Sequence, residues 1–190
     1  MNDSPPALMP PVVTARHPGW RFMLSHPAHV IALGFGSGCS PKAPGTVGTL
    51  WAWAAFLVFD RWLSPSQWGW LLLVGFVVGW WACTVTARHL GVADPGAVVW
   101  DEVLGFWLIL WLVMPAGFIG QLIAFVLFRF FDAVKPGPVA WADSRFKLRA
   151  RAADGSRPRP GWRQGFGIIF DDLVAALCAL LVISVWHAFH

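Results

Sequence analysis

The chain has 190 residues, of which 57% are hydrophobic and 13% carry a charge, against about 25% charged residues in soluble domains. With 14 Trp, 15 Phe and no Tyr, this composition excludes an ordinary soluble domain and is typical of one membrane-embedded domain with interfacial aromatic side chains. The net charge is +4, but no basic helix or nucleic-acid-binding motif occurs. The sequence therefore favours anionic lipid headgroups or phosphates over nucleic acid as partners.

The N-terminal segment, residues 1–27, is expected to be a flexible arm because it holds six prolines and no apolar signal-peptide core. Residues 28–190 then form the membrane domain. This domain begins with a short apolar stretch and continues into a Gly-rich loop, GFGSGCSPKAPGTVGTL, at residues 34–50. The many Gly and Pro residues before position 46 disfavour a regular helix there.

Apolar stretches then predict an all-α, membrane-embedded bundle of about five apolar helices, at residues 47–59, 67–86, 103–128 (two helices) and 166–186. A membrane crossing takes roughly 20 residues, so some of these helices are short. Residues 103–128 carry no charge, and we expect the chain to turn back at Pro115 because proline costs about 3 kcal/mol inside a helix. The polar, basic residues 135–163 are expected to form a loop.

The turn at Pro115 decides which groups share one side of the membrane. With it, the Gly-rich loop and all the carboxylates that lie beside apolar stretches reach the same face. Of the 14 Lys and Arg residues, all but Arg61 fall on or near that face. Because basic residues concentrate on the cytoplasmic side of membrane proteins, we expect this face to be cytoplasmic.

Five carboxylates lie within or beside the apolar stretches: Asp101, Glu102, Asp132, Asp171 and Asp172. An acid in such surroundings costs several kcal/mol unless something pairs with it, and two of these sites are doubled. Oxygen ligands in this number suit Mg²⁺, whereas the scattered Cys39, Cys83 and Cys178 do not suit zinc or a disulfide framework. Stabilisation of helix starts by negative charge is the alternative for each pair taken alone.

Arg129 and Lys135 share one side of a helix with Asp132 and are candidates to bind an anionic substrate, although cations at helix ends also simply reach toward water. In the Gly-rich loop, Ser37, Gly45 and Thr46 offer hydroxyl and backbone N–H groups just before a helix, which is a common anion site. The loop is not a Walker motif, so a plain turn remains the alternative.

Four motifs in order, GFGSGCSPKAPGTVGTL, VVWDEVLGFW, FRFFDAVKPGPV and GFGIIFDDLVAAL, resemble those of the phosphatidylglycerophosphatase A family of bacteria. The resemblance covers residues from about 25 to 187. It implies a Mg²⁺-dependent phosphatase of the inner membrane that converts phosphatidylglycerophosphate to phosphatidylglycerol. It also implies catalytic and metal-binding roles for the five carboxylates, and substrate-binding roles for Ser37, Gly45, Thr46, Arg129 and Lys135. Gly137 and Ala176 depart from the family's usual Trp and Gly, but neither departure removes a charge.

Two other classes stay open from the residues themselves: a cation transporter and a non-catalytic lipid-binding protein. The chemistry also stays open between direct attack by water and a phospho-aspartyl intermediate. Nothing in the sequence indicates the oligomeric state or the division of roles among the five acids.

Overall fold

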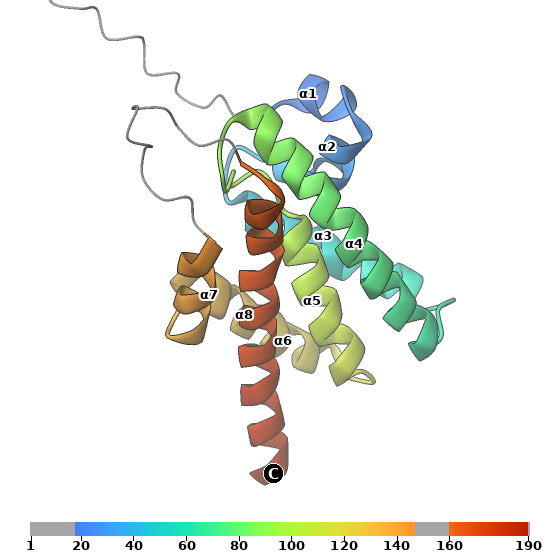
Figure 1. Cartoon of the computed structure of the whole chain (residues 1–190). Coiled ribbons are helices and arrows are strands. Elements are labelled where there is room, and N and C mark those ends of the chain that lie inside the picture. The colour runs from blue at the N-terminus through green and yellow to red at the C-terminus, as the bar shows by residue number, and fades with distance from the viewer. Residues whose placement is uncertain (1–17, 147–159, 190) are drawn as a thin grey trace, which may run out of the picture.

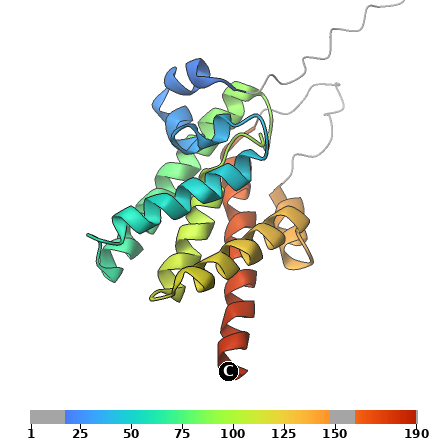
Figure 2. The same cartoon turned by 180° about the vertical axis from the view of Figure 1, so that it is seen from behind.

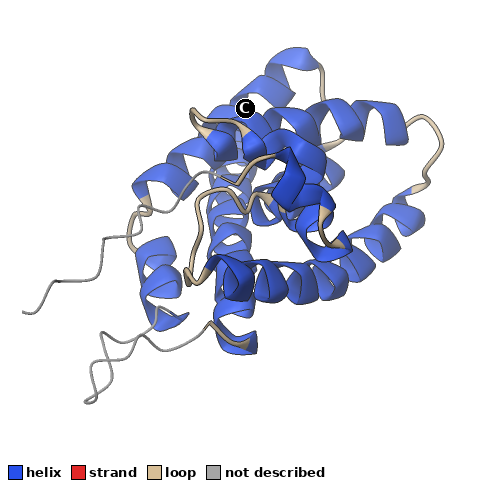
Figure 3. Cartoon of the chain, turned by 90° about the horizontal axis from the view of Figure 1, so that it is seen from above, coloured by secondary structure: helices blue, strands red, loops and turns tan. Residues whose placement is uncertain are grey.

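The computed structural model describes residues 18–146 and 160–189, and every regular element in those ranges is a helix (Figures 1 and 3). The elements in chain order are α1 (Trp20–Leu24), α2 (Pro27–Ala32), the 3₁₀ helix η1 (Gly34–Cys39), α3 (Pro44–Phe59), α4 (Pro65–Leu90), α5 (Trp100–Val113), α6 (Phe118–Val134), α7 (Pro138–Phe146) and α8 (Trp162–Phe189). The predicted all-α class is confirmed for these residues.

Helix α5 lies at the centre of the bundle, with α8 and α4 beside it, while α3 and α6 cross behind them in Figure 1 and in front in Figure 2. Val103, Phe106, Ile109 and Leu110 of α5 are fully buried in the core. Gly105 of α5 has little room for a side chain, because a Cβ there would stand 2.9 Å from the Phe128 ring and 3.2 Å from the carbonyl oxygen of Asp172. This close approach brings α6 and α8 against the first turns of α5.

The predicted turn within residues 103–128 is confirmed. Helix α5 ends at Val113 and α6 begins at Phe118, and the Met114–Pro115 peptide between them is cis. Proline has no N–H to continue the helix, so α5 ends here, and α6 slants back across α8 (Figure 2). As a result, the charged end of α6 lies near the acidic start of α5.

Two helices, α4 and α8, are long and apolar enough to cross a membrane by length and composition. The others fall short of that length: α3 has 16 residues, α5 has 14 and α6 has 17. Apolar helices therefore occur where the sequence predicts them, but only two of them satisfy the requirements of a full crossing. A membrane-embedded bundle of five apolar helices goes beyond these findings.

Three segments differ from expectation. Residues expected to lie in the N-terminal arm include α1, and residues expected to lie in the basic loop include α7, which packs along α8. The remaining residues of both segments, 1–17 and 147–159, lie outside the described residues. Helix α3 begins at Pro44, earlier than predicted, because proline is well suited to the first turn of a helix.

Candidate metal and phosphate site

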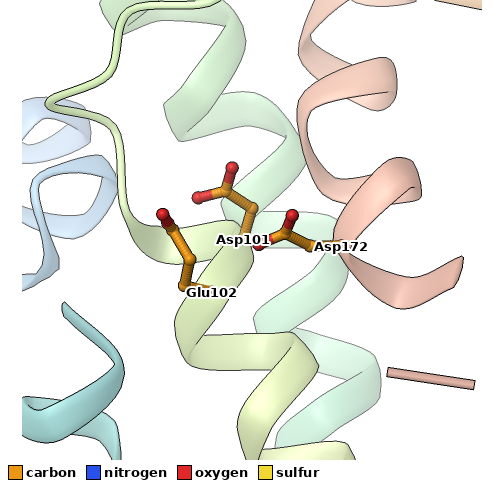
Figure 4. A group of neighbouring side chains, drawn as sticks. All are labelled: Asp101, Glu102 and Asp172. Atoms are coloured by element: carbon orange, nitrogen blue, oxygen red, sulfur yellow. The ribbon is translucent and has the colours of Figure 1, made fainter. Parts of the chain in front are cut away.

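Asp101 and Glu102 stand in the first turn of α5, and Asp172 faces them from α8 (Figure 4). One carboxylate oxygen of each lies within 4.8 Å of the other two. Asp101 and Asp172 are buried, and Glu102 exposes only 12% of its side chain. The three side chains thus form a compact group, which we call the carboxylate centre.

The carboxylate centre holds oxygens that nothing else in the described chain satisfies. Oδ1 of Asp101, Oε2 of Glu102 and Oδ2 of Asp172 are buried and have no hydrogen-bond donor among the described residues. Buried polar atoms are nearly always paired, and buried like charges repel one another as well. The donor set is all oxygen, so a hard cation such as Mg²⁺ fits it.

Asp132 of α6 lies beside this centre but is paired with a cation. Nη1 of Arg129 donates to Oδ2 of Asp132 at 2.5 Å and to Oγ1 of Thr49 at 3.4 Å, and it lies 3.8 Å from Oε1 of Glu102. Asp132 is also an electrostatic neighbour of Glu102 and Asp172. The Arg129 guanidinium therefore joins α3, α5 and α6 at the edge of the carboxylate centre.

Asp171, although adjacent to Asp172 on α8, has a different partner. Nζ of Lys135 donates to Oδ2 of Asp171 and, at 3.0 Å, to Oδ1 of Asp143 on α7. Burial by itself would lower the pKa of Lys135, but the hydrogen bond and the charge of Asp171 outweigh it and raise that pKa above its usual range. Lys135 is therefore an ammonium ion held between two helices.

The five predicted carboxylates thus fall into two sets. Asp101, Glu102 and Asp172 converge, and each keeps one buried oxygen without a hydrogen-bond donor among the described residues, whereas Asp132 and Asp171 are hydrogen-bonded ion pairs with Arg129 and Lys135. Neighbours along a helix point about 100° apart, which is why the Asp171–Asp172 pair divides between two sites. The sequence places all five acids on one face but does not reveal this division.

The residues of the Gly-rich segment are also divided. Gly45 lies against the carboxylate of Glu102 and the guanidinium of Arg129, where no Cβ has room. Thr46 follows it in the first turn of α3, where backbone N–H groups have no helical acceptor. Ser37 lies in η1 and donates its hydroxyl to the carbonyl of Gly34 at 2.8 Å. The structure therefore brings Gly45 into the site and places the Ser37 hydroxyl in a bond within η1.

Two residues at the site were missed by sequence reasoning. Thr49 is buried one helical turn after Gly45, donates to the Gly45 carbonyl at 2.8 Å, and receives a hydrogen bond from Arg129. A polar residue in an apolar helix was the available signal. Asp143 lies in a polar segment rich in charge, where nothing distinguishes it from a solvated residue.

Three histidines, His26, His29 and His89, lie together where α2 meets the end of α4. His29 hydrogen-bonds through Nε2 to Nδ1 of His89 at 2.8 Å, and through Nδ1 to the carbonyl of Phe22 at 2.9 Å. Because Nδ1 of His29 faces a carbonyl, it carries the proton, and His89 donates to Nε2. Burial lowers the pKa of His29, and the neighbouring His89 and His26 lower it further, although the Phe22 carbonyl opposes this. These contacts fasten α1 and α2 to α4.

The fold and the site define a helical bundle with two helices long and apolar enough to cross a membrane, and with a buried acidic cluster that could hold a metal ion beside two cationic side chains. The phosphatidylglycerophosphatase A family profile matches residues 30–151. The phosphatidylglycerophosphatase A of Escherichia coli (strain K12) is 35% identical over 83% of this chain and 81% of its own length. That of Haemophilus influenzae is 32% identical over 90% of this chain and 95% of its own length. The chain belongs to the phosphatidylglycerophosphatase A family and is an enzyme of the phosphatase class.

A third relative has a different name. The putative phosphatidylinositol-3-phosphatase of Bacteroides thetaiotaomicron is 32% identical over 82% of this chain and 91% of its own length. No solved structure matches this chain. The names of all three relatives refer to a phosphorylated lipid as substrate, but the lipid headgroup differs between the first two and the third.

Proposed function

We propose that the protein hydrolyses the terminal phosphomonoester of phosphatidylglycerophosphate, in a Mg²⁺-dependent reaction, to give phosphatidylglycerol and phosphate. The observation that carries this proposal is the set of three buried, unpartnered oxygens in the carboxylate centre, a few ångströms from the Arg129 guanidinium. The names of the two phosphatidylglycerophosphatase A relatives support the choice of substrate.

Asp101, Glu102 and Asp172 would hold the metal. They offer only oxygen ligands, and carboxylate oxygen in a buried site suits Mg²⁺ better than zinc or copper. When bound, Mg²⁺ neutralises negative charge on the phosphate and on the oxygen that leaves it. Two further carboxylates, Asp132 and Asp171, stand beside the centre with their own cations and complete the set of five acids proposed as catalytic and metal-binding.

The remaining groups bind the phosphate. Arg129 presents a planar set of N–H donors at the edge of the centre, and Lys135 adds a second positive charge. The N–H groups of Gly45 and Thr46 open α3, where the helix dipole favours an anion. Ser37 contributes by supporting the loop that leads to α3, since its hydroxyl is bonded within η1.

The reaction forms one P–O bond to water and breaks the P–O bond to the glycerol oxygen. One of the two ion-paired carboxylates, Asp132 or Asp171, takes the proton of the attacking water, and the proton then passes to the glycerol oxygen as it leaves. Attack by a carboxylate, with a phospho-aspartyl intermediate, is the second possible course. In both courses the cations hold the non-bridging oxygens as charge develops.

We place the protein in the bacterial inner membrane with several crossings and the site facing the cytoplasm. The lengths and apolar composition of α4 and α8 support membrane insertion. Among the described basic residues, Arg129 and Lys135 lie at the carboxylate centre and Lys42 lies just before α3, whereas Arg61 lies at the far end of α3. On this reading residues 28–190 are the lipid phosphatase domain, and residues 1–27 and the basic part of 135–163 lie in the cytoplasm.

A phosphorylated inositol lipid is the second candidate substrate, favoured by the name of the Bacteroides thetaiotaomicron relative. The same centre and cations serve any lipid phosphomonoester, because they contact the phosphate rather than the rest of the headgroup. Comparing kcat/KM for phosphatidylglycerophosphate and phosphatidylinositol 3-phosphate in the same micelles decides between the two.

The test is Mg²⁺-dependent phosphate release from phosphatidylglycerophosphate in detergent micelles. Asp101→Asn, Asp132→Asn and Asp171→Asn are expected to lose most of the activity. Asp60→Asn is the matched control, since Asp60 accepts a hydrogen bond from Trp68 at the far end of α3. Phosphate release retained in all three site variants would overturn the metal site. A transporter or a lipid-binding protein would show no release even as wild type.

A further inference from the structure

We propose that Asp143 is a positioning residue of this phosphatase: it fixes the Lys135 ammonium for the bound phosphate. Asp143 lies on α7, in a segment that the sequence presents as a basic loop, and its Oδ1 accepts from Nζ of Lys135 at 3.0 Å. This inference rests on the proposed function, because it takes Lys135 to be a phosphate-binding group.

The ammonium group of Lys135 needs hydrogen-bond acceptors on other helices to fix its position. A lysine side chain is a flexible stem with a compact charge, so a single acceptor leaves the ammonium free to swing about that contact. Asp171 on α8 and Asp143 on α7 accept from it on two different helices. Two acceptors fix the nitrogen in space and use two of its three N–H groups. One donor is left for a phosphate oxygen.

The backbone at Lys135 supports a role for this particular side chain. Lys135 ends α6 with φ at 48°, in the left-handed region where glycine is the least strained residue. A glycine would end the helix at lower conformational cost but would supply no ammonium. Residue 135 therefore combines a strained backbone with a charged side chain whose ammonium group is bound by two carboxylates.

Helix α7 is built to carry Asp143. Val139 and Ala142 of α7 are fully buried, and the helix packs along α8. The Phe146 side chain of α7 lies against Gly167 of α8, where a Cβ on residue 167 would clash with it. Asp143 follows directly after the buried Ala142, and its side chain is 13% exposed. The packing of α7 on α8 therefore sets the position of the carboxylate that receives Lys135.

A double-mutant cycle tests the inference, with kcat and KM for phosphatidylglycerophosphate measured separately. Asp143→Leu should lower kcat/KM about 10- to 100-fold, as the loss of an outer supporting partner does at other sites. In a Lys135→Met background the same change should cost less than about twofold, because the group it positions is already gone. An equal loss in both backgrounds would mean that Asp143 acts elsewhere and would overturn the inference.

A second comparison keeps the question decidable if Lys135→Met is too slow to measure. Asp143→Asn keeps an acceptor oxygen and should stay within a few-fold of wild type, whereas Asp143→Leu should not. Equal losses in these two variants would contradict positioning through the hydrogen bond. Ser144→Ala, on the exposed side of α7, is the matched control and should leave activity unchanged.

The wild-type assay separates this inference from the proposed function. If wild type releases no phosphate from the lipid, the proposed function fails. If wild type is active and Asp143→Leu matches it, only the positioning role fails. Thermal unfolding of each variant, recorded in parallel, shows whether a loss of activity comes with a loss of fold.

Discussion

The backbone of Gly45 lies so close to the carboxylate of Glu102 that no side chain fits between them. A Cβ on residue 45 would also stand only 3.1 Å from Nη2 of Arg129. The first turn of α3 therefore contacts both the Glu102 carboxylate and the Arg129 guanidinium. This contact is possible only because residue 45 has no side chain.

Gly45→Ala should therefore displace Glu102 or Arg129 and lower kcat/KM on the order of 100-fold, the effect expected of a misplacement of about 1 Å. Alanine has a higher helix propensity than glycine, so the helix itself should not lose stability. Gly96→Ala is the matched control, since its added Cβ meets no atom within 4 Å. Activity of Gly45→Ala close to that of the control would contradict the tight contact.

Mg²⁺ should stabilise the folded protein through the carboxylate centre. A ligand at 100 times its Kd adds about 2.7 kcal/mol to the free energy of unfolding. Asp172→Asn should abolish the rise in thermal midpoint on adding Mg²⁺, because it removes one of the three converging carboxylates. Thermal unfolding with and without the ion measures this without any assay of activity. An unchanged Mg²⁺ response in Asp172→Asn would place the ion elsewhere.

Arg129→Lys should not preserve function despite keeping the positive charge. The guanidinium contacts Asp132, Thr49 and Glu102 from one nitrogen and still has further donors for phosphate, which an ammonium on a shorter reach does not reproduce. We expect kcat/KM to fall about 10- to 100-fold, corresponding to the 1.5–3 kcal/mol typical of hydrogen bonds to charged groups. Steady-state kinetics at saturating Mg²⁺ is the measurement, and wild-type values would refute the role.

The burial of His29, beside His89 and His26, should make stability depend on pH. The pKa of His29 is lowered in the folded state, so its neutral form is favoured there, and the associated stability is complete above pH 6.5 and lost as pH falls through the folded pKa. His29→Phe keeps a ring next to Phe22 but cannot titrate. The wild type should lose this contribution between pH 8 and pH 5 whereas the variant should not, so the advantage of the wild type in thermal midpoint should become smaller. A constant difference would exclude His29 as the titrating group.

The orientation in the membrane is testable by labelling single cysteines in intact cells, with Cys39, Cys83 and Cys178 replaced by serine. Trp62→Cys follows α3 on the side opposite the carboxylate centre, and Gly155→Cys lies in the sequence between α7 and α8. An impermeant maleimide should label position 62 and leave position 155 unlabelled until the cells are opened. Labelling of position 155 from outside would reverse the proposed orientation.

Much of the arrangement follows from local sequence. Pro115 in an uncharged stretch breaks the helix by its own chemistry, and that single break places Asp132 on the same side as Asp101. Apolar stretches mark α3, α4 and α8 within a few residues, because burial and length decide them. These features depend on residues close together in the chain, which is why the sequence is sufficient.

The pairing of the charged groups does not follow in the same way. Lys135 meets Asp143 across a turn and Asp171 from another helix, and Arg129 meets Thr49 from 80 residues away. Which carboxylate stays unpaired depends on helix rotation and on side-chain reach, neither of which the spacing of acids along the chain reveals. The polar composition around Asp143 resembles a solvated loop, and only the packing of α7 on α8 shows otherwise.

The reversal at Pro115 also has a consequence for the lipid around the protein. A helix of 14 residues extends about 21 Å, whereas the hydrocarbon core of a bilayer is about 30 Å thick. If α5 and α6 lie in the membrane as proposed, the bilayer would become locally thinner where they turn back, or lipid tails would fill the space beneath the turn. The substrate would then meet the enzyme at a dimple in one leaflet, and turnover should vary with the acyl-chain length of the host membrane.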